Sequence, residues 1–97
     1  MPDKHRDYTI NSIFARALNN TGEYQQALDT MEIIREQGET DPLWHYRRGF
    51  SLGALDRYIE AEAALYRAKS LANESDPVIN WADELLEEIK ENQNPKV

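Results

Sequence analysis

The chain repeats an apolar pattern at an interval of 34 residues. Four positions of one segment return in a later one at this offset: Tyr24, Ala27, Met31 and Ile34 recur as Tyr58, Ala61, Leu65 and Ala68. Further upstream, Ala15 and Leu18 recur as Gly49 and Leu52. A fixed period of this length is typical of stacked helical hairpins, in which each unit buries its apolar face against the next. Arrays of this kind usually bind other proteins, so the pattern favours a binding function over a catalytic one.

Glycine and proline separate the apolar segments and predict five helices, at about 7–20, 23–37, 42–54, 57–72 and 77–91. On the first helix, the spacing places Ile10, Phe14, Ala17 and Leu18 on one side. We expect Gly22 to form a turn with positive φ. The pairs Asp41-Pro42 and Asp76-Pro77 are expected to open the third and fifth helices, because aspartate caps free N–H groups and proline suits the first helical position.

The fifth helix has the pattern of a terminal cap. One side carries the apolar residues Val78, Ile79, Ala82, Leu85, Leu86 and Ile89, and the other carries Asn80, Asp83, Glu84, Glu87 and Glu91. A helix that closes an array needs one face for the preceding helices and one for water. The sequence therefore predicts a complete short module that ends in this helix, followed by a polar, frayed tail over residues 92–97.

Size and charge restrict the functions that we consider. The 97 residues make one domain, and 11 Lys and Arg against 18 Asp and Glu give a net charge of −7. This balance disfavours binding to nucleic acid or to an anionic membrane surface. The sequence has neither an apolar run long enough to cross a bilayer nor a recognisable secretion signal, so we expect a cytoplasmic protein. The absence of cysteine excludes disulfides and cysteine-based zinc sites.

The repeated residues resemble the tetratricopeptide repeat, whose signature is W-x-x-L-G-x-x-Y in one helix and A-x-x-x-F-x-x-A in the next. The matching residues are Phe14, Ala15, Leu18, Ala27, Met31 and Ile34 in one repeat, and Gly49, Leu52, Ala61, Leu65 and Ala68 in the other. The resemblance implies an all-α, right-handed α-solenoid of antiparallel helix pairs. Repeat one then covers about 8–38, repeat two about 42–73 and the capping helix about 77–91. Asp56 stands where the family has the glycine of the turn, and Arg48 stands at a normally apolar place.

The resemblance also implies a concave groove, lined by the first helix of each pair, in which partners bind. By position the groove residues are Ser12, Arg16 and Asn19, then Tyr46, Arg47, Phe50 and Gly53, and finally Trp81 and Glu84. Arginine matches carboxylates, and aromatic side chains bury a large area at low entropic cost. We therefore expect a partner protein or peptide with acidic and apolar side chains. The alternative is that Tyr46 and Phe50 pack the helix junction while the arginines are solvated. Trp44 is expected in the core.

No pattern in the sequence predicts catalysis, a metal site or a cofactor. His5 is placed in a ragged N-terminal segment, and His45 has no second histidine at ligand spacing. The acidic run from Asp83 to Glu91 is expected to be a solvated helix face. Two hypotheses follow: a module that binds a peptide segment in its groove, and a structural adaptor or scaffold subunit that self-associates as a homodimer. About three repeats are usually needed for stability, and a dimer would supply the missing buried area.

Overall fold

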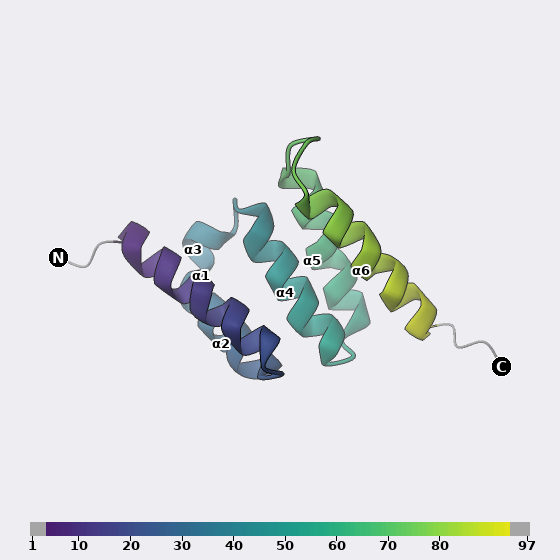
Figure 1. The fold of residues 1–97 in the computed structure, drawn as a ribbon, viewed down its shortest axis with the longest axis horizontal. Coiled ribbons are helices and arrows are strands. Elements are labelled where there is room, and N and C mark those ends of the chain that lie inside the picture. The colour runs from purple at the N-terminus through teal and green to yellow at the C-terminus, as the bar shows by residue number, and fades with distance from the viewer. Residues whose placement is uncertain (1–3, 94–97) are drawn as a thin grey trace.

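The computed structural model describes residues 4–93, which form six α-helices and no strand (Figure 1). In chain order the helices are α1 (Lys4–Asn20), α2 (Tyr24–Ile33), α3 (Arg35–Gly38), α4 (Pro42–Ala54), α5 (Tyr58–Leu71) and α6 (Val78–Gln93). The predicted all-α class is confirmed. Residues 94–97 of the predicted polar tail lie outside the described residues, and residues 92–93 belong to α6.

The helices pack mainly against their neighbours in the sequence. Helix α1 packs on α2, α4 on α5, and α5 on α6, while α4 also touches α1, α2 and α6 (Figure 1). The result is an elongated molecule of 56 × 30 × 18 Å, with α1 near one end and α6 at the other. The central position of α4 allows its residues to meet both α1 and α6.

The two Asp-Pro pairs open helices as predicted. Asp41 caps α4, because its Oδ1 accepts a hydrogen bond of 3.0 Å from the backbone N–H of Leu43. Asp76 does the same before α6, where its Oδ1 accepts from the N–H of Val78 at 2.9 Å. Each cap satisfies a donor that the first turn of a helix leaves without a partner.

The second predicted helix is wrong in one respect: it is two helices, α2 and α3, separated at Ile34. Ile34 leaves the helical conformation with φ −110° and ψ 23°. The carbonyl of Met31, which a continuous helix would pair with the N–H of Arg35, instead accepts from Ile34 N–H at 3.2 Å and from Trp44 Nε1 at 3.1 Å. The break thus follows from a side chain that inserts from α4.

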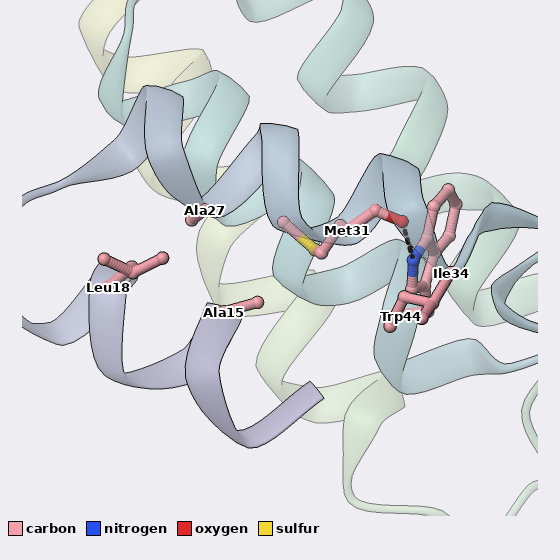
Figure 2. Close-up of a cluster of buried hydrophobic side chains, with 6 residues drawn as sticks. All are labelled: Ala15, Leu18, Ala27, Met31, Ile34 and Trp44. Atoms are coloured by element: carbon pink, nitrogen blue, oxygen red, sulfur yellow. Dashed lines mark hydrogen bonds between the residues drawn. The ribbon is translucent and has the colours of Figure 1, made fainter. Parts of the chain in front are cut away.

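Trp44 belongs to one of two core clusters. The first consists of Ala15, Leu18, Ala27, Met31, Ile34 and Trp44, and Figure 2 shows the indole nitrogen bonded to the Met31 carbonyl. The second joins α4, α5 and α6 through Leu52, Ala61, Ala64, Leu65, Ala82 and Ile89. Trp44 is 2 % exposed, so its predicted place in the core is confirmed.

Small residues occupy the closest helix contacts. Ala15, Ala27 and Ala61 are fully buried. A Cβ added at Gly49 would stand 2.7 Å from side-chain atoms of Leu65, which is closer than real Cβ atoms approach. These positions are the ones that recur at the 34-residue offset, so the repeat corresponds to a repeated close approach of helices.

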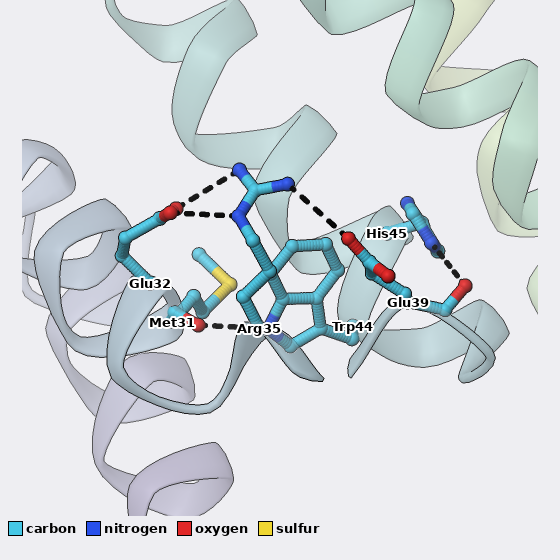
Figure 3. A network of polar contacts seen from close by, with 6 residues as sticks. All are labelled: Met31, Glu32, Arg35, Glu39, Trp44 and His45. Atoms are coloured by element: carbon cyan, nitrogen blue, oxygen red, sulfur yellow. Dashed lines mark hydrogen bonds and ion pairs between the residues drawn. The ribbon is translucent and has the colours of Figure 1, made fainter. Parts of the chain in front are cut away.

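A polar network covers the outer side of the first cluster (Figure 3). The guanidinium of Arg35 lies 5.5 Å from the centre of the Trp44 ring and pairs with Glu32 through two hydrogen bonds of 2.7 and 2.9 Å. This hydrogen bonding raises the pKa of Arg35 above its ordinary value. A ring nitrogen of His45 lies 2.9 Å from the carbonyl of Glu39. The Arg35 and Glu32 side chains are largely exposed, so the pair adds little stability beyond shielding the indole.

Arg48, the departure from the apolar pattern, is half-buried on α4. Burial is the main cause that lowers its pKa, and the nearby charge of Arg35 lowers it further, while Glu32 and Glu60 raise it. The long aliphatic stem of an arginine can cover apolar surface while its charged group stays near water.

The apolar side predicted for α1 is largely uncovered. Ile10, Phe14 and Ala17 are exposed, and of the four predicted residues only Leu18 is buried. The buried side of α1 is instead formed by Ala15, Leu18 and Asn19, because α2 and α4 pack there. The helix also begins at Lys4, so His5, which we expected in a ragged segment, belongs to α1.

The turns that follow α1 and α4 share an unusual backbone conformation. Gly22 has φ +83° as predicted, and Asp56, 34 residues later, has φ +62°. Glycine takes this left-handed conformation without a steric penalty, whereas a residue with a Cβ is strained there. The Asp56 carboxylate accepts a hydrogen bond of 2.8 Å from the Tyr58 hydroxyl.

Replacing Asp56 with glycine is expected to raise the free energy of unfolding by about 0.5–1 kcal/mol, because it removes the left-handed strain. The Tyr58 hydrogen bond is exposed and its loss is a smaller effect. Thermal unfolding followed by circular dichroism measures the gain. Asp56→Ala is the control, since it loses the same hydrogen bond and keeps the strain. Equal melting temperatures for the two variants would contradict the argument.

Candidate functional site

Six of the seven predicted partner-binding residues meet in one cleft. The cleft has a volume of about 320 Å³ and lies where α1, α4 and α6 come together. Its lining consists of Arg16, Asn19, Asn20, Leu43, Tyr46, Arg47, Phe50 and Trp81, and we call it the candidate cleft. The fold thus brings together side chains that are up to 65 positions apart, from Arg16 to Trp81.

The floor of the candidate cleft is held by a buried hydrogen-bond network. Asn19 is 6 % exposed, and its Oδ1 accepts a bond of 2.6 Å from the Ser51 hydroxyl. Its Nδ2 donates to the carbonyl of Arg47 at 3.3 Å. Asn19 therefore ties α1 to α4, and its polar atoms already serve this structural contact.

Two arginines form a basic end of the candidate cleft. Arg47 on α4 is half-buried, while Arg16 on α1 is exposed. Burial lowers the pKa of Arg47 and the charge of Arg16 lowers it further, whereas Asp41 raises it. Asp41 is itself engaged by the hydroxyl of Tyr8 and by the first turn of α4. Arg47 thus lies near a second guanidinium group and one carboxylate that is already engaged, which leaves this end positive.

The Tyr8 hydroxyl that bonds to Asp41 has a strongly raised pKa. Burial is the largest cause, followed by the hydrogen bond to Asp41 and the charge of that carboxylate. The hydroxyl therefore stays protonated and keeps donating to Asp41. Ser12, which was predicted to line the groove, lies beside this hydroxyl and not in the candidate cleft.

Aromatic side chains form the other end of the candidate cleft. The rings of Tyr46 and Trp81 are 5.9 Å apart and tilted by 41°, and Trp81 is 44 % exposed. Phe50 packs on Tyr24 of α2 at 6.3 Å. Burial raises the pKa of the Tyr46 hydroxyl, and the charges of Glu84 and Glu88 raise it further. These rings pack against one another at the helix junction, and they also line the cleft.

Two further predicted groove residues lie outside the candidate cleft. Gly53 belongs to a neighbouring depression of about 160 Å³, which it shares with Phe50, Leu85 and Ile89. Glu84 is exposed on α6 and acts on the cleft through its charge near Tyr46. The depression and the candidate cleft meet at Phe50, so a continuous surface follows α4.

The sequence interpretation missed Leu43 and Asn20 among the lining residues. A signal for Leu43 was present, because positions 43, 46, 47 and 50 have the spacing of a single helix face. Asn20 is the last residue of α1, and helical periodicity does not predict which way a residue at a helix end faces.

Within residues 4–93 no three histidine, aspartate or glutamate side chains are grouped so that they could hold a metal ion. None of the six described helices is both long enough and apolar enough to span a bilayer. The chemistry that the candidate cleft presents is therefore that of two guanidinium groups beside aromatic rings.

Comparison of the chain with protein-family models, with curated proteins and with solved structures gives no match.

Proposed function

We propose that this chain is a tetratricopeptide-like module, a short right-handed α-solenoid, that binds a peptide segment of another protein in the candidate cleft. The observation that carries the proposal is the meeting of Arg16 and Arg47 with Tyr46, Phe50 and Trp81 in one cleft of a chain whose net charge is −7. Arginine and large aromatic residues are the types that contribute most to protein–protein binding energy.

The solenoid part of the proposal is supported by structural features that recur at the sequence offset. Gly22 and Asp56 share the left-handed turn conformation. Ala27 and Ala61 are both fully buried at helix contacts. Helix α6 covers the second pair on one side and exposes its carboxylates to water, as a capping helix would.

The charge distribution suggests how a peptide would lie. A carboxylate of the peptide would pair with Arg16 and Arg47 at the α1 end, where bidentate contacts are strong. An apolar or aromatic side chain would lie against Tyr46 and Trp81. The α6 end is acidic through Glu84 and Glu88, so a second carboxylate is disfavoured there. The preferred ligand is an extended or helical segment with an acidic residue followed or preceded by an apolar one.

Selection from a random peptide library displayed on phage, followed by fluorescence anisotropy of the enriched peptides, tests this function. We expect enriched peptides to combine an acidic and an apolar residue. Arg47→Glu should raise their Kd by about 10- to 100-fold, because a charge-assisted hydrogen bond contributes about 1.5–3 kcal/mol. Arg16→Glu should also raise the Kd, and because Arg16 is exposed this substitution leaves the core unchanged.

The matched control is Arg67→Glu, which makes the same charge change at an exposed position of α5, a helix that contributes no residue to the candidate cleft. Far-UV circular dichroism of each variant confirms that the helices remain. Peptide binding that survives both Arg47→Glu and Arg16→Glu, with helicity intact, would show that the cleft is not the binding site.

A further inference from the structure

An apolar face lies uncovered at the N-terminal end of the molecule. Of the seven large hydrophobic side chains exposed within residues 4–93, four lie on α1 and α2: Ile10 (53 %), Ile13 (61 %), Phe14 (54 %) and Ile33 (74 %). With Ala17, the three on α1 follow the spacing of one helix face. Ile33 lies beside α1, near Lys4 and Asn11. We call these five residues the N-terminal face.

The same positions one period later show what such a face does in this fold. The residues 34 positions after Ile10, Phe14 and Ala17 are Trp44, Arg48 and Ser51 on α4. Trp44 inserts into the preceding helix pair and donates to the carbonyl of Met31, and Ser51 donates to Asn19. On α4, therefore, these positions pack against a neighbouring pair of helices. The N-terminal face repeats the positions of a helix-packing surface.

The other end of the molecule is not a suitable partner for this face. Helix α6 exposes Asp83, Glu84, Glu87 and Glu91, of which Asp83 pairs with Lys69 of α5. Head-to-tail contact between two copies would press the apolar residues of α1 against these carboxylates, which are costly to desolvate. Like faces can meet instead about a two-fold axis, and such an isologous contact closes after two copies.

The charge of α1 favours this contact. Helix α1 carries Lys4, Arg6 and Arg16 against Asp7, in a chain whose net charge is −7. Two copies that meet through α1 therefore bring together less negative charge than copies that meet through the rest of the acidic chain. Antiparallel α1 helices would place Lys4 beside the carboxyl end of the second α1, where helix carbonyls carry partial negative charge and Glu23 follows.

We propose that the N-terminal face is a self-association surface, which pairs with the same face of a second copy through antiparallel α1 helices. A helix of 17 residues is about 26 Å long, so one such face per copy makes an interface at the small end of the range for specific contacts. The dimer is accordingly weak, with a dissociation constant in the micromolar range or above, and its population rises with concentration.

Sedimentation velocity over a hundredfold range of concentration tests the proposal. The wild-type chain should move from the mass of one 11.3 kDa chain toward twice that value. Ile13→Glu should remain a monomer throughout, since it places a carboxylate within the apolar face. Ile13 is 61 % exposed, so the substitution leaves the core intact. Lys4→Glu should weaken the dimer through the charge at its end.

The matched control is Ile59→Glu, the same change on α5 at a side chain that is 84 % exposed. It should dimerise like the wild type. A wild-type chain that stays monomeric, or an Ile13→Glu variant that dimerises as well as Ile59→Glu, would overturn the proposal. The inference does not depend on the candidate cleft: Arg47→Glu should still dimerise, and Ile13→Glu should still bind any peptide selected with the wild type.

Discussion

Replacing Trp44 with alanine is expected to lower the free energy of unfolding by about 3–5 kcal/mol, which is a large part of the total for a domain of this size. Trp44 is 2 % exposed, and it packs in one cluster with Met31 and Ile34 (Figure 2). A Cβ added at Gly38 would overlap the indole, which shows how tightly the ring is enclosed. The alanine variant loses this packing together with the hydrogen bond to the Met31 carbonyl.

Urea unfolding followed by far-UV circular dichroism measures the loss. Trp81→Ala is the control, because it removes the same side chain from a position that is 44 % exposed. We expect a clearly smaller loss than for Trp44→Ala, since 44 % of the Trp81 surface stays in water on folding, against 2 % for Trp44. Equal losses for the two tryptophans would contradict the central role of Trp44.

Replacing Leu65 with alanine is expected to cost about 2–5 kcal/mol, because Leu65 is fully buried in the second cluster. Gly49 provides a sensitive check of this packing. In the wild type, a Cβ at position 49 would stand 2.7 Å from Leu65, so Gly49→Ala should destabilise by overpacking. In the Leu65→Ala variant the same Cβ enters vacated space, and Gly49→Ala should restore part of the lost stability.

A double-mutant cycle of these two substitutions measures their coupling. Gly53→Ala on the same helix is the control, because its Cβ would make an ordinary contact of 3.4 Å with Ile89. It should stabilise both backgrounds by up to about 1 kcal/mol through helix propensity alone. An additive cycle for Gly49 and Leu65 would mean that the close approach of α4 and α5 has relaxed.

The sequence predicts the features of this fold that depend on neighbouring residues. The caps at Asp41 and Asp76 and the turn at Gly22 follow from local rules, and the structure confirms them. The bounds of α4 also agree with the prediction. The break at Ile34 could not be predicted in this way, because its cause is the indole of Trp44, which reaches the Met31 carbonyl from a different helix.

Two other features of the structure could not be predicted, because they also depend on contacts between helices. Periodicity shows that one side of α1 is apolar, but whether another element covers that side depends on the packing of α2 and α4. Arg16 and Arg47 line one cleft, as the groove prediction requires. The sequence does not predict the bond between Asn19 and Ser51, since that pairing depends on the side-chain geometry at the helix crossing.

The position of Leu28 has a consequence for how the molecule loses its structure. This half-buried side chain on α2 packs against both core clusters. In linear arrays each unit is stabilised by its neighbours, so the interface between units determines whether they can melt separately. With only two helix pairs and a shared side chain between their cores, disruption of either cluster removes support from the other. We therefore expect the described helices to unfold together, as a single cooperative unit.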